Sequence, residues 1–220
     1  MVATPYLLVA PALILYGLFM LYPLGKAAWL SLYDWDGMSV GVFVGLSNYL
    51  DMVRDAGLRA SFAHAGLLLV FYCAIPLMVG LVIAAVLNRA SVRGLGFFRT
   101  VFFLPQVIAM VVVATAWGGI YAFAGPINSA LRGVGLGSLT RDWLGSYTLA
   151  LPAIGLIGTW VQTGLVVVLM LSGMSKISPD LVDAARIDGA GAIRVFFVVT
   201  LPSIVGEIAV AATLTIVAAL

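Results

Sequence analysis

A polar stretch at residues 177–202 carries side chains whose spacing suits recognition of another protein. Ser178 precedes Pro179, and Asp180 and Asp183 follow within one turn. A serine oxygen can accept from an unpaired amide at a helix start, and proline has no amide to leave unpaired. Carboxylates near that start meet the positive end of the helix dipole. The sequence therefore predicts a short helix that begins at Ser178.

One face of this predicted helix is shallow. Positions at the i, i+3, i+4, i+7 spacing share it, and two of them are alanine, so another backbone could approach closely: Leu181, Ala184, Ala185 and Asp188. Gly189 and Gly191 should end the helix, and 194–201 should form a second one before Pro202. Two interpretations are open at this point. The loop is either an amphipathic connector on lipid headgroups or a helix that docks in a groove of a soluble partner.

The register of the whole stretch resembles a known family. The series Asp183-Ala184-Ala185, Gly189, Val199, Leu201 and Pro202 resembles the EAA loop of permease subunits in binding-protein-dependent ABC importers. The run AARIDGA, with Phe196 and TLP after it, is similar to the carbohydrate branch. Two positions depart from the pattern, namely Asp183, where Glu is usual, and Gly206, where a further Pro is common.

The resemblance implies a set of ATPase-coupling residues, which are Asp183, Ala184, Ala185, Asp188, Gly189, Ala190, Leu201 and Pro202. It extends to the runs SLYDWDG and VGLSNY near the N-terminus and to LNRASVRGLGFFRTVFFLP in the middle of the chain.

Composition places the chain in a bilayer. Of 220 residues, 63% are hydrophobic and only 9% are charged, whereas soluble domains have about a quarter charged. The net charge of +2 comes with no basic patch that would indicate nucleic acid. Cys73 has no partner cysteine, so no disulfide or thiolate metal site is expected, and His64 reads as an interfacial residue. No GxxxxGK[ST] loop is present, so the chain should not itself bind ATP.

The expected fold is an all-α, polytopic transmembrane bundle in one domain, residues 1–220. Apolar runs long enough for a hydrocarbon core of about 30 Å predict five spans. These spans are residues 5–24, 63–87, 101–121, 149–171 and 204–220, with a cytoplasmic coupling loop at 173–202. By the resemblance, the common core is that of a type I ABC importer permease. It also implies a further C-terminal span, and the short stub before the first span suggests an upstream tail.

Charge sets the expected orientation. The loops assigned to the cytoplasm carry an excess of basic residues over acidic ones, with Arg89, Arg93, Arg99, Lys176, Arg186 and Arg194 against Asp180, Asp183 and Asp188. Cytoplasmic loops of membrane proteins are enriched in Lys and Arg. The sequence therefore predicts an N-terminus on the inside.

Polar and aromatic residues within the spans are the candidates for a solute pathway, because intramembrane polar groups are costly. Trp160, Gln162 and Gly164 form the first candidate group, and a helix–helix hydrogen bond is the competing interpretation for Gln162. Trp117, Tyr121 and Asn128 are the second group, with an interfacial aromatic belt as the alternative. Glu207 is expected to pair with a basic residue of the coupling loop or of a neighbouring subunit.

The resemblance implies a transmembrane subunit of a sugar importer in the bacterial inner membrane. Its partners would be a second permease, two ATPase subunits that hold ATP and Mg²⁺, an extracytoplasmic solute-binding protein and membrane lipid. A polyol phosphate such as glycerol phosphate is the alternative solute. A secondary transporter or channel is disfavoured because the sequence shows neither broken helices nor charges at mid-membrane. A scaffold without transport would leave the register of the loop unexplained.

Overall fold

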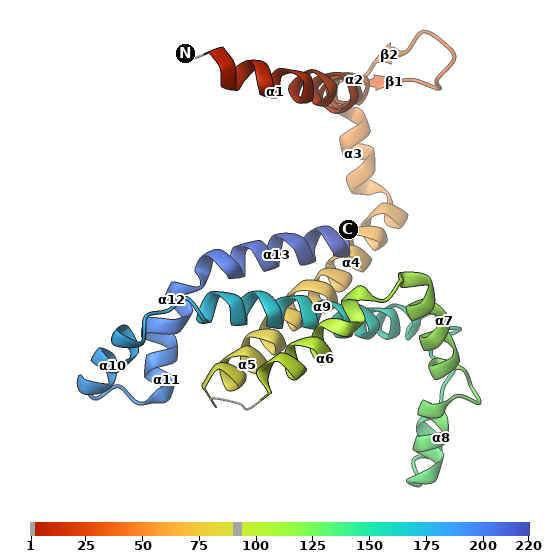
Figure 1. Ribbon diagram of the computed structural model, residues 1–220. Coiled ribbons are helices and arrows are strands. Elements are labelled where there is room, and N and C mark those ends of the chain that lie inside the picture. The colour runs from red at the N-terminus through yellow and green to blue at the C-terminus, as the bar shows by residue number, and fades with distance from the viewer. Residues whose placement is uncertain (1–2, 90–93) are drawn as a thin grey trace. The chain divides into compact units, whose positions relative to one another are not determined.

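The computed structural model describes residues 3–89 and 94–220 and shows an almost entirely helical chain (Figure 1). It divides into two compact units, Met1–Phe62 and Ala63–Leu220. Arg93 and its neighbours 90–92, which the sequence assigns to a basic cytoplasmic loop, lie outside the described residues. The predicted all-α class is confirmed.

The first unit begins with one long helical segment. It comprises α1 (Ala3–Tyr16), the π-helical turn η1 (Gly17–Leu21) and α2 (Tyr22–Leu30), and it contains an apolar stretch long enough to cross a membrane, Leu8–Leu30. The segment therefore extends six residues beyond the predicted end of the first span at residue 24. A hairpin and α3 (Ser47–Arg54) follow.

The hairpin pairs β1 (Tyr33–Asp34) with β2 (Val42–Phe43), antiparallel, with Tyr33 opposite Phe43. Its turn is organised by Asp36, whose carboxylate accepts from the backbone amides of Ser39 and Met38 at 2.7 and 2.9 Å and from the Ser39 hydroxyl at 2.8 Å. These hydrogen bonds lower the pKa of Asp36 from 3.8 to about 2, and those from the Ser39 and Met38 amides have the largest effect. This short hairpin is the exception to the helical pattern in the first unit.

The second unit is built around one central helix. α4 (Ala56–Leu69) enters it and continues through the π-turn η2 (Val70–Ala74) into α5 (Ile75–Arg89). Then come α6 (Leu95–Val107), α7 (Met110–Tyr121), α8 (Pro126–Gly133), the short η3 (Gly137–Leu139) and the central α9 (Ala150–Met174). The last elements are α10 (Pro179–Ile187), α11 (Ala192–Val195), η4 (Phe196–Thr200), α12 (Leu201–Ser203) and α13 (Val205–Ala219).

Three π-turns share one sequence cause. Each ends two residues before a proline, namely Pro23, Pro76 or Pro202. In each case the residue just before the proline donates its amide to a carbonyl five residues back, as Ile75 does to Val70. Proline has no amide and its ring crowds the carbonyl four residues back, so a wider turn relieves that contact. The kink predicted at Pro76 thus takes the form of a π-turn inside a continuous helix.

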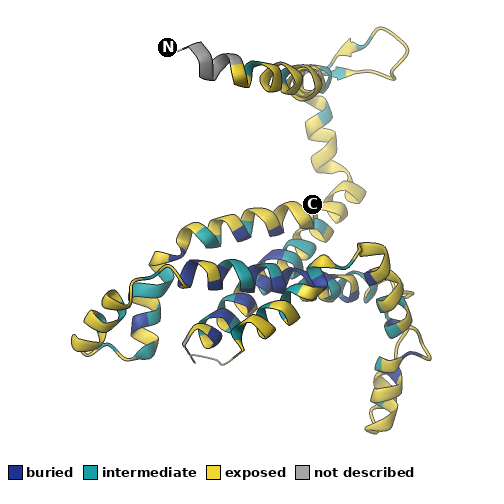
Figure 2. Ribbon diagram, in the orientation of Figure 1, coloured by how far each residue is buried: buried dark blue, intermediate teal, exposed yellow. Residues whose placement is uncertain are grey.

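α9 forms the core of the second unit, and burial is concentrated on it and on its contacts with α5, α6 and α13 (Figure 2). Glycines allow this close packing, as the small residues of the fourth span predict. A Cβ at Gly164 would lie 1.9 Å from the Phe102 carbonyl oxygen, so α9 meets the backbone of α6 at this point. α9 agrees closely with the predicted span 149–171 and is three residues longer at its end.

One predicted detail of the spans is wrong. The span expected at 101–121 is broken, because Ile108 and Ala109 are extended and separate α6 from α7. A bend of 69° between residues 192–203 and 205–219 lies where the last span was predicted to begin. Among residues 3–89 and 94–220, four helices are long and apolar enough to cross a membrane, or five when this bent pair counts as one span. The absence of broken helices therefore no longer argues against a secondary transporter.

Candidate functional site

α10 is a short helix with a local signal at each end. At its start the Ser178 side chain accepts from the Asp180 amide at 3.3 Å, as predicted. At its end the Gly189 amide donates to Arg186 at 3.0 Å and the Ala190 amide donates to Ala185 at 2.9 Å. This pair of bonds, with Gly189 at φ +80°, is the Schellman arrangement that satisfies the last carbonyls. The predicted break at Gly189 and Gly191 is confirmed.

The predicted docking face of α10 is open. Leu181, Ala184 and Asp188 are exposed, and Ala185 is half-buried. Asp183 forms an ion pair with Arg186 at 3.2 Å, one turn along the same helix, and both side chains are more than half exposed. A pair so exposed contributes little to stability. The Asp183 carboxylate is therefore available to exchange Arg186 for a cation on another protein.

A neighbouring side of α10 faces a cavity of about 440 Å³. Val182 and Arg186 contribute to it from α10, together with residues from the end of α5 and from α11 and η4. Val182 and Arg186 are four residues apart and share one side of α10, which is turned about 100° around the helix from the side of Leu181 and Ala185. Leu201 is half-buried and Pro202 is exposed in α12, so these two predicted coupling residues lie beyond α10 and not on its face.

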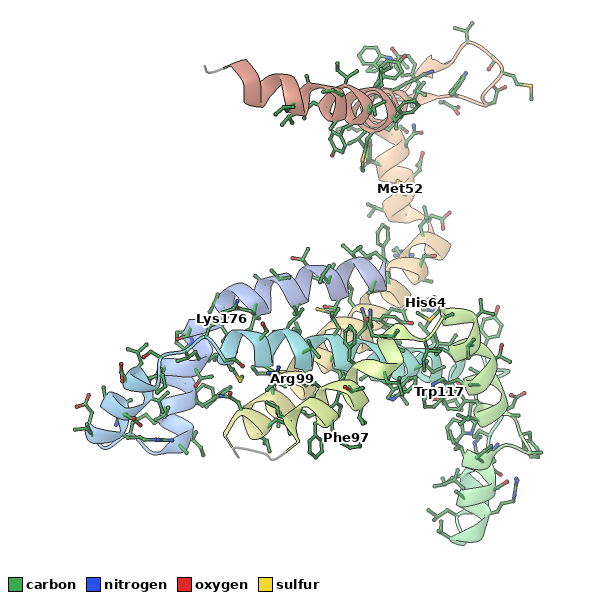
Figure 3. All side chains as sticks on the ribbon, viewed as in Figure 1. Met52, His64, Phe97, Arg99, Trp117 and Lys176 are labelled. Carbon is green, nitrogen blue, oxygen red and sulfur yellow. The ribbon has the colours of Figure 1, made fainter. Side chains whose placement is uncertain are left out.

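Polar contacts connect the end of α9 to its neighbours. Lys176 donates to Glu207 of α13 at 3.0 Å, which confirms the pairing predicted for Glu207 with a basic residue of the loop. Arg99 of α6 donates to the Ser175 hydroxyl at 3.5 Å. Both cations lie near the negative end of the α9 dipole, where they are favourable. Lys176 lies at this end of α9 and Trp117 near the other end (Figure 3).

Aromatic rings gather where α7 meets the first half of α9. Trp160 lies edge-on to Trp117 with ring centroids 5.5 Å apart, and Trp117 lies 5.4 Å from Tyr121. Tyr121 in turn lies 6.4 Å from Trp143, which follows α8. Trp160 is 41% exposed and Trp117 half-buried, so these two present an open aromatic surface. Such faces suit the apolar side of a sugar ring as well as a lipid-facing belt.

The structure separates the other pathway candidates from this surface. Gln162 is 4% exposed and two residues from Trp160, which puts it on the opposite side of α9. Gly164 packs against the α6 backbone, so it serves helix contact and does not line a path in this conformation. The expected cluster of Trp160, Gln162 and Gly164 is therefore not one patch.

Asn128 has a structural role in this conformation. It is fully buried, and its amide nitrogen donates to the carbonyls of Phe123 and Arg141 at 3.2 and 2.8 Å. Its oxygen accepts from the Arg141 amide at 3.3 Å and the Trp143 indole at 3.0 Å. These bonds hold the loop after α8 and leave little capacity for a solute.

The sequence did not predict two contacts of the site. Trp143 joins the aromatic cluster from a loop, and the Thr159 hydroxyl donates to the Phe71 carbonyl at 2.6 Å. Pro76 was a partial signal for the Thr159–Phe71 contact, because a proline has no amide and so leaves a nearby carbonyl without its helical donor. Nothing in the spacing of Trp143 indicated the first.

A family model described as the inner membrane component of binding-protein-dependent transport systems matches residues 74–220. The chain belongs to this family of membrane transport permeases.

Relatives support the same assignment. The probable ABC transporter permease protein YurN of Bacillus subtilis is 38% identical over 216 residues, which cover 96% of this chain and 74% of the relative. The alpha-glucoside transport system permease AglF of Rhizobium meliloti is 33% identical over 94% of this chain and 61% of its own length. The sn-glycerol-3-phosphate permease UgpA of Yersinia pestis is 34% identical, with 91% and 67% covered. The chain thus spans about two thirds of the length of these relatives.

A solved structure shows the same fold. A chain of a bacterial ABC transporter that imports the acidic polysaccharide alginate superposes with a TM-score of 0.72, over 96% of this chain and 71% of that one. Sequence identity is 21%, so this likeness concerns the fold alone.

Proposed function

We propose that this chain is a transmembrane subunit of an ATP-driven, binding-protein-dependent importer that moves a mono- to oligosaccharide into the cell by alternating access. The observation that carries the proposal is α10, a helix closed at both ends by its own residues, with its docking face Leu181, Ala184, Ala185 and Asp188 turned outward. A helix so stabilised can enter a groove without first having to fold, which lowers the entropic cost of docking.

The ATPase subunits are the proposed occupants of that face. They bind ATP and Mg²⁺ and carry out the hydrolysis, and two of them serve this chain and a second, related permease. When they close on ATP, α10 is displaced as a unit. The Lys176–Glu207 pair and the packing of Gly173 against the Glu207 side chain connect that end of α9 to α13. Displacement of α10 is thereby transmitted into the membrane helices.

The orientation proposed is N-terminus inside, in the bacterial inner membrane. Arg99, Lys176, Arg186 and Arg194 all belong to the α6 start or the α10–α11 region, which favours placing these segments in the cytoplasm. The solute-binding protein then meets the other ends of the spans.

The solute class follows from the relatives and from the aromatic surface. Among relatives at 30% identity or more are permeases named for diacetylchitobiose, alpha-glucosides and lactose. The open faces of Trp160 and Trp117 provide stacking area for a pyranose ring. The glycerol-3-phosphate relatives make a polyol phosphate the second candidate.

ATP hydrolysis by the purified complex in lipid tests the proposal, with its binding protein and a panel of mono-, di- and trisaccharides and polyol phosphates. Stimulation by a saccharide supports the proposed solute class, and stimulation by a polyol phosphate alone replaces it with the second candidate. A complex from which no ATPase subunit can be recovered contradicts the docking role of α10.

A further inference from the structure

Thr159 forms a hydrogen bond of a different kind from those of five other threonines in the described helices. These five donate to the carbonyl four residues back on their own helix at 2.6 to 3.0 Å, namely Thr100, Thr115, Thr163, Thr213 and Thr215. This local bond is the usual one for a threonine inside a helix. Thr159 instead donates across to Phe71, 88 residues away, at 2.6 Å.

The Phe71 carbonyl needs a donor because of the π-turn η2. In an α-helix it would accept from the amide of Ile75, but that amide donates to Val70 instead. The next residue is Pro76, which has no amide to offer. A carbonyl without a partner inside a membrane bundle costs several kcal/mol, so a donor from another helix is strongly favoured.

The surface of α9 is shaped to receive this turn. A Cβ at Gly155 would lie 2.5 Å from the Phe71 ring, and one at Gly158 would lie 2.1 Å from the Tyr72 ring. Both glycines lie within the turn that precedes Thr159, and they admit the two rings next to the hydrogen bond. Below the turn, Gly80 leaves room for Val166 in the same way. The contact between α9 and η2 thus consists of close packing with one polar bond at its centre.

We propose that Thr159 is a positioning residue for transport: its hydroxyl holds the π-turn η2 against α9 in this conformation and releases it when the bundle changes access. This inference rests on the proposed function, since it assigns the bond a role in the alternating-access cycle. The hydroxyl has a second acceptor within reach of a rotamer change, the Gly155 carbonyl four residues back, by the same local bond that Thr163 makes. The Thr159 hydroxyl therefore stays bonded in both states, whereas the Phe71 carbonyl gives up this donor in the second state.

A π-turn is a suitable element for such a change. It carries one residue more than the α-helical register, and π-turns occur at functional positions in helices. When Thr159 leaves Phe71, the segment above the turn, α4, can rotate or bend relative to α5 without breaking regular helix bonds. The bond thus selects between two arrangements of the second span.

The test uses the whole importer in lipid nanodiscs, with Cys73→Ala as background and spin labels at cysteines replacing His64 on α4 and Val86 on α5, both exposed. The distance distribution between the labels is measured with and without ATP by double electron–electron resonance. Thr159→Val deletes the hydroxyl, Thr159→Ser keeps it, and Thr163→Val deletes a hydroxyl that bonds only its own helix. Solute transported per ATP hydrolysed is measured in parallel in proteoliposomes.

Thr159→Val removes one hydrogen bond, which should change the ratio of the two populations in the distance distribution about fivefold. Fewer solute molecules should also be moved per ATP. Thr159→Ser should restore both readouts, and Thr163→Val should leave both unchanged. Equal effects of Thr159→Val and Thr163→Val, or failure of the serine variant to restore the distribution, would overturn the proposal. If no saccharide is transported but the distances still respond as stated, the sugar assignment fails and the role of Thr159 stands.

Discussion

α9 and α10 lie next to each other in the chain and are stabilised in contrasting ways. α9 has 25 residues, about half of them buried, and its contacts depend on glycines that admit other helices. α10 has nine residues, none of them buried, and depends on Ser178 at its start and Gly189 at its end. A helix held by packing fixes the bundle, whereas one held by its own caps can keep its shape while it moves against a partner. The two should therefore fail in different ways when they are mutated.

The largest effect should come from Gly164→Ala in α9. The added methyl would lie 1.9 Å from a backbone oxygen of α6, and backbone cannot move aside as a side chain can. We expect a loss of about 3 kcal/mol or more in the free energy of unfolding, or failure to assemble. Thermal unfolding in detergent measures it. Gly118→Ala is the matched control, because a Cβ there meets nothing within 4 Å.

Gly189→Pro should damage coupling and spare the bundle. The native φ of +80° is closed to proline, and the substitution also removes the amide that donates to Arg186. The variant should insert into the membrane and unfold near the wild-type temperature while it loses most of its ATPase subunit. Co-purification measures this loss. Gly189→Asn, which tolerates positive φ, should retain much of the binding. A Gly189→Pro complex with normal transport would argue strongly against docking by α10.

Glu207→Gln should have a small effect. The Lys176–Glu207 pair joins the end of α9 to α13, but Lys176 is 71% exposed, so screening by water leaves about 0 to 1 kcal/mol. We expect a slight decrease in the unfolding temperature that becomes smaller in high salt. The double variant Lys176→Met with Glu207→Gln should be no less stable than the single one. A decrease as large as that of Gly164→Ala would show that the pair is not solvent-screened.

Asp36 provides the smallest and most local test, in the hairpin of the first unit. Its pKa is lowered to about 2 by the Ser39 and Met38 amides, so the turn gains stability above the ordinary value of 3.8 and loses it as the pH falls through about 2. A carboxyl-carbon NMR titration in micelles should place the midpoint near 2. In Asp36→Asn the same turn should show no such transition. A midpoint near 3.8 would mean that these hydrogen bonds do not form in solution.

The same contrast explains how much the sequence could predict. The start of α10 at Ser178, its end at Gly189 and the all-α class follow from local rules, and the structure bears them out. The break at Ile108–Ala109 has only a weak signal, because Val107 to Met110 are apolar and Pro105 and Gln106 precede the break without marking its position.

Contacts between side chains of different helices could not be predicted from the sequence either. Trp160 and Gln162 are close in sequence, but side chains two residues apart on an α-helix point to nearly opposite sides. The Thr159–Phe71 bond joins residues 88 apart, and only packing decides which helix lies next to which. The coupling and pathway residues remain predictions, since no observation of the isolated chain tests contact with a partner.

The most direct test of the central claim is photo-cross-linking from α10 in the intact importer. A photoreactive amino acid replaces Ala184 on the docking face or, as the control, Met38 in the hairpin, which is 95% exposed and which the proposed orientation assigns to the outside. We predict that the probe at Ala184 captures the ATPase subunit and that the probe at Met38 does not. Capture of the ATPase from Met38 would contradict the proposed orientation, and no capture from Ala184 in an assembled complex would contradict the docking role of α10.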